Sequence, residues 1–322
     1  MRDDRKDLIS GQASQTLNSL LSGLSGEEAM LLDQMKEEIL ADISRYAKMV
    51  DYLQPIKEVE GIFLKKTVHY SQADQIILKQ ALVAKMALHL PTILEKMDLP
   101  ASILALYPNA FGRLADFLKR AGNDPYDSTS ESFGKDIRFV LAKSIPFGVQ
   151  YVELASNIPL ASAILSFFRS RDLSGIIRYF RAGGSGPWLR SHVDSRYITE
   201  FNEDGFIRFY LRLAEILKLH KNIKGYVGTS WFFDPQLLKV SPRLAYLQMC
   251  PLEGGAFRLQ HGTQSSDIAS AIKTSATRRR LYKEGKYTPT CYSMVWPRKE
   301  LIAWVKQNII EKRMNHENSI RD

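Results

Sequence analysis

The chain has 322 residues, of which 45% are hydrophobic and 25% are charged. This composition is that of a folded protein and excludes a chain that is disordered along its whole length. The length exceeds that of a typical single domain, so we expect about two domains.

The net charge of +9 arises because 44 Lys and Arg residues outnumber 35 Asp and Glu residues. A basic balance favours phosphate-rich partners in general. Here the basic residues are spread along the whole chain and mixed with acidic ones, so we expect no nucleic-acid partner.

The chain has two cysteines, Cys250 and Cys291, which are too few for a disulfide framework. The segment from Met1 to Asp7 has mixed charge and lacks the apolar stretch of a secretory signal. We therefore expect reduced thiols and a cytoplasmic protein.

The chain up to about residue 182 has mostly helical patterns. Residues 1–24 are polar and rich in Ser, Gly and Gln, which predicts a flexible N-terminal arm. A helix is predicted to begin at Ser25, because Ser25 and Glu28 have the spacing of a capping box. A short strand is predicted over 60–68 and a second strong helix over 71–90.

Helical patterns return at Lys135 and continue to about Phe180, with breaks at Pro146 and Pro159. The glycine-rich segment 183–187 then interrupts the chain, and we place the main domain boundary there. Residues 25–182 are therefore predicted to form a helical domain.

The last third alternates between helical and strand patterns, which is typical of a mixed sheet covered by helices. We expect an α/β domain over 187–313 and a polar tail over 314–322. The fold class is therefore α+β, with a helical N-terminal region followed by a C-terminal mixed α/β domain with a small sheet. The expected helices are 202–219, a short one from Ser241, 265–282 and 297–313, and the expected strands are 223–233, 256–260 and 288–296.

Small polar residues followed by aromatic ones end the first of these strands, at Thr229, Ser230 and Trp231. Polar groups at a carboxyl end of a strand suit a ligand crevice. The same segment also suits a strand end that packs aromatic side chains into the core, with Asp234 in the turn. Both interpretations stay open.

Two further segments carry charged side chains. Glycines flank the strand over 256–260, which carries Arg258 and is followed by His261. A histidine at a strand end can act as a general base, although a single histidine is more often structural. Arg278 begins a run of three arginines in a helix, which could hold a phosphate or a carboxylate, or lie on a solvated face.

The order of elements in the last third resembles the second half of the GCN5-related acyltransferase fold. In particular, the helix over 266–282, the loop 284–287 and the following strand are similar to the late helix, loop and strand of that family. The resemblance implies a small-molecule enzyme that transfers an acyl group from an acyl-CoA. It places Thr229, Ser230 and Trp231 along the strand, His261 as the base, and Tyr282 or Tyr287 near the leaving thiol. With the charged groups above, the candidate catalytic residues are His261, Ser230 and Tyr287, and the candidate binding residues are Thr229, Trp231, Asp234, Arg258 and Arg278.

Two other functions stay open. His192 and Asp194 lie two residues apart, and with His261 they could form an iron site of two histidines and one carboxylate in a non-haem enzyme. The chain could instead be a non-enzymatic adaptor whose helical half binds a partner protein. In that case an anionic membrane surface is another partner, because apolar and basic residues alternate on a helical period over 167–181.

Overall fold

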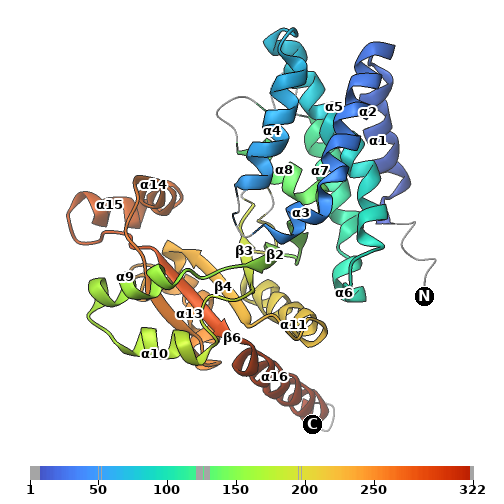
Figure 1. Ribbon diagram of the computed structural model, residues 1–322. Coiled ribbons are helices and arrows are strands. Elements are labelled where there is room, and N and C mark those ends of the chain that lie inside the picture. Colours follow the sequence, from blue (N-terminus) through green and yellow to red (C-terminus); the bar gives the residue numbers. More distant parts are fainter. Residues whose placement is uncertain are drawn as a thin grey trace. The chain divides into compact units, whose positions relative to one another are not determined.

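The computed structural model describes residues 8–319 except 50, 52, 121–125, 127–130, 195 and 197 (Figure 1). The chain divides into two compact units, residues 1–155 and residues 156–322. The expected domain boundary at 183–187 thus lies inside the second unit.

The first unit is built around one long helix, α5 (Gln72–Leu94), which contacts α1, α2, α7 and α8. Ser71 caps α5 by accepting a hydrogen bond from the amide of Asp74. Aliphatic side chains are buried on most sides of this helix, among them Leu78, Leu82 and Leu90. The helices of this unit are α1 (Gly11–Ser22), α2 (Gly26–Ala41), α3 (Ile43–Lys48), α4 (Gln54–Thr67), α5, α6 (Ala101–Leu104), α7 (Tyr107–Arg120) and α8 (Ser132–Val140).

The chain segment expected to be a flexible arm contains a helix in its described part. Ser10 caps α1 through a hydrogen bond from the amide of Ala13. Ala13 and Leu17 are buried, and α1 contacts α5 and α7. Few apolar residues mark this segment in the sequence, yet two of them suffice to pack α1 on the helical core.

The region expected to be a strand over 60–68 is helical and belongs to α4. Pro55 occupies the first turn of α4, where its fixed φ angle suits a helix and its missing amide costs no hydrogen bond. Val59, Phe63 and Thr67 recur every fourth residue and are buried, so one helical face accounts for the apolar pattern.

Among the described residues, α5 is long and apolar enough to cross a membrane by length and composition, and half of its apolar window is buried. Its contacts with four other helices account for this apolar character. A single helix of this kind is typical of a buried core helix as well.

Two short strands lie within residues 145–156, where helices were expected. Strand β1 (Ile145–Pro146) pairs antiparallel with β2 (Tyr151–Ser156), with Ile145 opposite Val152. Gly148 has a φ of +98°, a conformation that glycine adopts readily, and the amide of Phe147 donates to the carbonyl of Gln150. The turn at Gly148 therefore reverses the chain between the two strands.

The second unit contains a four-strand mixed sheet in the order β3-β4-β6-β5. Its strands are β3 (Trp188–His192), β4 (Gly225–Ser230), β5 (Phe257–Gln260) and β6 (Tyr292–Pro297). β3 and β4 are parallel and are connected through α11 (Glu203–Leu219). β6 pairs antiparallel with both β4 and β5.

One face of this sheet is covered by α9 (Leu160–Ser170) and α10 (Ser174–Arg181), both of which contact β5. Their core side chains Ala163 and Tyr179 pack in one cluster with Trp188, Val227 and Val295 from three strands. The buried cluster thus packs α9 and α10 on this face of the sheet.

The other face is covered by α11, α13 (Tyr246–Glu253) and α16 (Arg298–Ser319). The Tyr210 ring of α11 lies 5.1 Å from the Trp296 ring of β6, and the Trp304 ring of α16 lies 5.3 Å from Trp296. The second unit is thus a sheet between two layers of helices (Figure 1). The expected α+β class is confirmed, with a helical N-terminal region and a C-terminal mixed α/β part.

The remaining elements of the second unit are short. The helix expected over 265–282 is divided into α14 (Ser265–Lys273) and α15 (Ala276–Lys283), because Ser275 starts a new helix by accepting from the amide of Arg278. A 3-10 turn at Trp231–Phe233, α12 (Leu237–Val240) and a second 3-10 turn at Pro242–Leu244 follow β4.

Candidate functional site

The two parallel strands of the sheet stop pairing with each other before they end. In the part of the chain that the structure describes, their ladder joins Leu189 to Tyr226 and Arg190 to Val227. β3 nevertheless continues to His192 and β4 to Ser230. In open α/β sheets, ligands bind outside the carboxyl ends of parallel strands, and this is such an edge.

A row of polar side chains crosses the sheet at this edge. Arg190 of β3 donates from Nη1 to Oγ1 of Thr229 on β4 at 3.1 Å. Thr229 Oγ1 lies 2.7 Å from Oγ of Ser293 on β6, and Ser293 Oγ lies 2.7 Å from Nε2 of His261 after β5. We call Arg190, Thr229, Ser293 and His261 the polar row.

Strand alternation brings the polar row together. Side chains two residues apart in a strand lie on the same face, so Thr229 follows the buried Val227, and Ser293 precedes the buried Val295. Thr229 and Ser293 are also register partners in the antiparallel β4–β6 ladder. The polar row is therefore the continuation of the apolar cluster under α9 and α10, at the end where the strands leave the core.

His261 has the electrostatic environment of a neutral imidazole. Burial lowers its pKa below the usual value of 6.5, and the nearby positive charges of Arg190 and Arg169 lower it further. Its backbone amide donates to the carbonyl of Cys291 at 2.8 Å, which fixes the residue beside β6. A neutral ring nitrogen can accept a proton near neutral pH.

Arg190 is held rigidly at the other end of the row. Its Nε donates to Oγ of Ser156 at 2.7 Å, and its Nη2 donates to the carbonyl of Asn157 at 2.8 Å. Its Nη1 donates to Thr229, so the threonine hydroxyl accepts one hydrogen bond from the guanidinium. Thr229 is exposed, whereas Ser293 is buried, so the row leads from the surface into the sheet.

Sequence patterns identified Thr229 and His261 but missed Arg190 and Ser293. The serine stands inside the β6 sequence Tyr-Ser-Met-Val-Trp, where a buried polar residue in an apolar strand is itself a signal. Arg190 lies in β3, a strand that was not expected, so its side chain could not be placed on a sheet face in advance.

Two of the candidate binding residues, Asp234 and Arg258, belong to a second cluster around Gln248. Asp234 accepts hydrogen bonds from the amides of Gln236 and Thr290, and burial raises the pKa of its carboxyl group. The Gln248 side chain donates to the carbonyls of Phe232 and Asp234 and accepts from the guanidinium of Arg258. These contacts join the segment after β4 to α13, β5 and the segment just before β6.

The candidate residues Ser230 and Tyr287 do not belong to the polar row. Ser230 Oγ accepts from the amide of Phe232 and caps the 3-10 turn at Trp231–Phe233. Tyr287 is buried, and burial together with the carboxylate of Asp234 raises the pKa of its phenol. Their assignment to catalysis stays a prediction.

Arg278 is buried and uses its guanidinium within the protein. It donates to the carbonyl of Ala271 at 2.6 Å, to Oγ of Ser241 at 2.9 Å and to Oγ1 of Thr274 at 3.1 Å. Its guanidinium also lies 4.7 Å from the centre of the Trp231 ring, a cation–π contact. These contacts favour a structural role for both Arg278 and Trp231 over the ligand-binding role expected for them.

The residues expected for an iron site do not form one. Among the described residues, no group of three or more His, Cys, Asp or Glu side chains is placed to hold a metal ion. Asp194 instead makes a two-pronged ion pair with Arg196, at 3.0 Å to Nε and 2.7 Å to Nη2. The set of His192, Asp194 and His261 therefore does not fit a metal in this structure.

The glycine-rich segment 183–187 has a structural explanation. The amide of Gly183 donates to the carbonyl of Phe180, and the amide of Gly184 donates to the carbonyl of Tyr179, which closes the C-terminus of α10. Both glycines have positive φ angles, +100° and +70°. Their amides are consequently used by the helix end and do not form a phosphate loop.

Comparisons with known proteins give little beyond the geometry. No family model and no curated protein matches the chain. One solved structure is similar, an acyltransferase mutant in complex with octanoyl-CoA, at 12% sequence identity and a TM-score of 0.37, over 88% of this chain and 99% of that chain. At this level of similarity the chain is not assigned to a family.

Proposed function

We propose that the protein is an acyl-group transferase that acts on a small molecule and uses the polar row to accept the proton of the attacking nucleophile. The single observation that carries this proposal is the unbroken hydrogen-bonded chain Arg190–Thr229–Ser293–His261 at the carboxyl edge of the parallel strands. The element order that resembles GCN5-related acyltransferases points to an acyl-CoA as the donor.

The hydrogen bonds of the row have one consistent direction. Arg190 has only donors, so Thr229 accepts from Arg190 and donates to Ser293, and Ser293 donates to Nε2 of His261. Each hydroxyl then has one donor and one acceptor role filled, and the exposed Thr229 oxygen keeps a free acceptor site. A proton that reaches Thr229 can therefore move through Ser293 to the imidazole.

The proposed step balances its atoms and charges. An amine or hydroxyl nucleophile attacks the thioester carbonyl and gives its proton to Thr229, while the Thr229 and Ser293 protons each move one place towards His261. The carbon–nitrogen or carbon–oxygen bond forms as the carbon–sulfur bond breaks, and the thiolate leaves with the electron pair. The proton on His261 returns along the row to the thiolate, which leaves as the free thiol.

The two cysteines are not candidates for a covalent acyl intermediate. Burial raises the pKa of the Cys291 thiol to about 12, and it also raises that of Cys250. Both are therefore protonated near neutral pH and are poor nucleophiles. Both thiols are free of disulfides.

The experiment that tests this function measures thiol release from acyl-CoA donors of increasing chain length in the presence of small amines and alcohols. His261→Gln should lower the turnover rate by about 100-fold or more, the usual contribution of a general base. The control is His69→Gln, because His69 is exposed and lies in the first unit. Turnover that is equal in both variants, or no acyl transfer with any donor, would overturn the proposal.

A further inference from the structure

Helix α9 turns its more apolar side away from the sheet. The side chains that it buries are small, Ala163 and Ser166. The side chains that it exposes are Ile164, Leu165 and Phe168, and Phe168 is 61% exposed. A surface helix that packs on a core normally has the opposite arrangement.

Helix α10 has the same inverted arrangement. It buries Gly175 and Tyr179, and it exposes Ile177 and Phe180, with Phe180 59% exposed. Leu173, between the two helices, is also exposed. Since α9 and α10 contact each other, we call the exposed side chains of Ile164, Leu165, Phe168, Leu173, Ile177 and Phe180 the α9–α10 face. Clusters of exposed large apolar side chains often mark an interaction site.

Arginines border the α9–α10 face. Arg169, Arg171, Arg178 and Arg181 all fall within the two helices and their connection and are exposed. Asp172 is the one acidic residue of the segment, and its carboxylate accepts hydrogen bonds from the amide and hydroxyl of Ser174. The face therefore combines apolar side chains with a net positive border.

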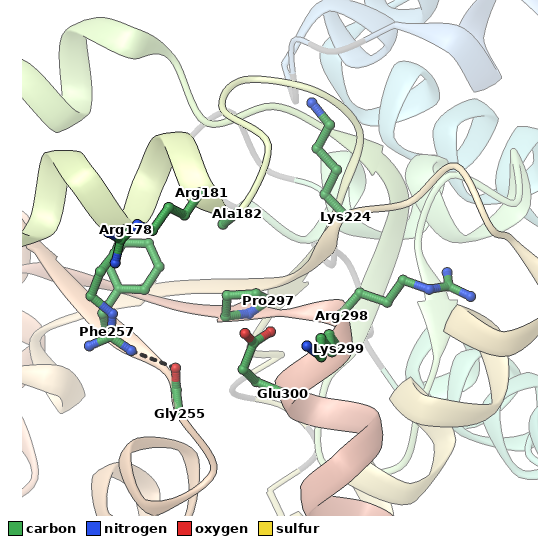
Figure 2. Close-up of a pocket in the computed structure, with 10 residues that line it drawn as sticks. All are labelled: Arg178, Arg181, Ala182, Lys224, Gly255, Phe257, Pro297, Arg298, Lys299 and Glu300. Atoms are coloured by element: carbon green, nitrogen blue, oxygen red, sulfur yellow. Dashed lines mark hydrogen bonds between the residues drawn. The ribbon is translucent and has the colours of Figure 1, made fainter.

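A basic cavity lies at the end of α10. The cavity has a volume of about 490 Å³, and five cationic side chains and one carboxylate line it (Figure 2). These side chains are Arg178, Arg181, Lys224, Arg298, Lys299 and Glu300. Arg178 and Arg181 belong to the same helix as Ile177 and Phe180, so the cavity adjoins the α9–α10 face.

The cations of this cavity are of two kinds. Arg178 donates to the carbonyl of Gly255 at 2.6 Å and Arg298 to that of His220 at 2.9 Å, so these two help to form the wall. Lys224 donates to the carbonyl of Gly183. Arg181 and Lys299 are exposed at opposite sides of the hollow and come from α10 and α16 (Figure 2). Arg181 and Lys299 are the groups placed to receive an anion.

We propose that the second unit docks on an anionic phospholipid membrane through the α9–α10 face, with the basic cavity beside α10 receiving headgroup phosphates. The apolar side chains enter the boundary between headgroups and acyl chains, and the arginines contact the phosphates. The charge pattern favours a membrane over a second copy of this chain, because a symmetric dimer would place the same arginines against each other. This membrane contact is independent of acyl transfer.

The test is co-sedimentation of the full chain with large vesicles, without any acyl donor. One set contains phosphatidylcholine alone, and a second set contains phosphatidylcholine with phosphatidylserine at about three to one. The partition coefficient calculated from the bound fraction should be at least about tenfold higher for the anionic vesicles than for phosphatidylcholine alone. Added salt should reduce this difference. Equal binding to both sets, or no binding to either, would overturn the proposal.

Two pairs of substitutions separate the apolar from the charged contribution. Phe168→Ser with Phe180→Ser should reduce partitioning about tenfold or more on both vesicle sets. Arg181→Ala with Lys299→Ala should reduce it on anionic vesicles and leave binding to phosphatidylcholine alone unchanged. All four side chains are exposed, so folding should be retained, which the thermal midpoint verifies.

Matched controls lie elsewhere on the surface. Met30→Ser with Val68→Ser removes apolar side chains of equal exposure from the first unit, and Lys218→Ala with Lys239→Ala removes the same charge from the second. Neither should change vesicle binding. If a control pair reduced vesicle binding as much as its matched test pair, the assignment of the α9–α10 face and the basic cavity as the membrane-binding surface would be overturned. A different outcome would point to a second copy of the chain as the partner. In that outcome the wild-type chain does not bind vesicles but sediments as a dimer, and Phe168→Ser with Phe180→Ser abolishes the dimer.

Discussion

The hydroxyl oxygen of Ser293 lies 2.7 Å from Nε2 of His261. Ser293 is buried, so its hydroxyl has no bulk solvent to exchange protons with and depends on its two side-chain neighbours. Its other neighbour, Thr229, is exposed at the surface. The serine is therefore the link on which the proposed proton path depends.

Replacing Ser293 with Ala should break this path and lower the rate of acyl transfer by about 10- to 100-fold, while the free energy of unfolding falls by about 1 kcal/mol. The matched control is Ser241→Ala, which removes another buried hydroxyl with a side-chain partner, Arg278. Steady-state rates and urea unfolding would be measured for both. Equal losses of rate in the two variants would contradict the role of Ser293.

The pKa of His261 also predicts a dependence of stability on pH. The pKa is lowered in the folded state, so the unfolded state binds the proton first as the pH falls through about 6.5. The folded state therefore loses stability from about pH 6.5 downwards until the lowered pKa is reached, and nothing is lost at higher pH. His89, whose pKa is also lowered by burial, adds a loss of the same sign.

Thermal midpoints measured between about pH 5 and about pH 8, the range in which histidines titrate, test this prediction. His261→Gln should flatten the decrease below about pH 6.5, and His261→Gln with His89→Gln should flatten it further. His69→Gln, at an exposed histidine of the first unit, serves as the substitution control. A wild-type curve that is retained in the His261→Gln variant would show that His261 is not protected from protonation in the folded state.

Arg278→Ala should destabilise the second unit by about 2–4 kcal/mol, because it leaves the Ala271 carbonyl and the Ser241 and Thr274 hydroxyls without their donor and removes the contact with Trp231. The control is its neighbour Arg279→Ala, which is exposed and should cost under about 0.5 kcal/mol. Urea unfolding measures both. If Arg278→Ala keeps full stability and loses ligand binding, the ligand role expected from the sequence is correct instead.

Gly225 is predicted to be irreplaceable at the start of β4. Its φ is +152°, and a Cβ there would lie 2.3 Å from the carbonyl oxygen of Trp296 and 2.8 Å from the Trp188 ring. Gly225→Ala should therefore cost well over the ~1 kcal/mol expected for an unfavourable φ angle alone. Gly285→Ala supplies that reference, because Gly285 has a φ of +67° and a Cβ there would meet open space.

The difference between the two alanine variants isolates the steric contribution. Denaturant midpoints should place Gly285→Ala close to wild type and Gly225→Ala far below it. Comparable midpoints for the two variants would show that β4 and β6 can separate at this point without loss.

Most of the strands and longer helices from 202 onward were predictable because they have local signals. Asn202 caps α11, glycines flank β5, and a short run rich in strand-forming residues marks β6. The strands β2 and β3 were missed for the opposite reason. β2 contains Glu153 among apolar residues, and β3 directly follows the glycine-rich turn. Neither segment has the alternating pattern of a half-exposed strand.

The candidate site was predictable in part, for the same physical reason. Thr229 and His261 stand at strand ends that the sequence marks, so they could be named. Their connection through Ser293 depends on β6 lying between β4 and β5, which no local pattern specifies. Arg278 was named as a ligand-binding residue, but its burial against Trp231 could not be predicted. In the sequence, an arginine within a basic run resembles a surface residue.

The position of β6 has a consequence for synthesis of the chain. β6 is the last strand in the sequence, yet it lies between β4 and β5 and makes both of their antiparallel ladders. While the ribosome is still making residues before Tyr292, β4 presents one unpaired edge and β5 has no ladder in the described sheet, because β5 pairs with β6. The second unit must therefore wait for its final strand, and premature termination after β5 would release a fragment with an open edge at β4 and an unpaired β5, prone to aggregation.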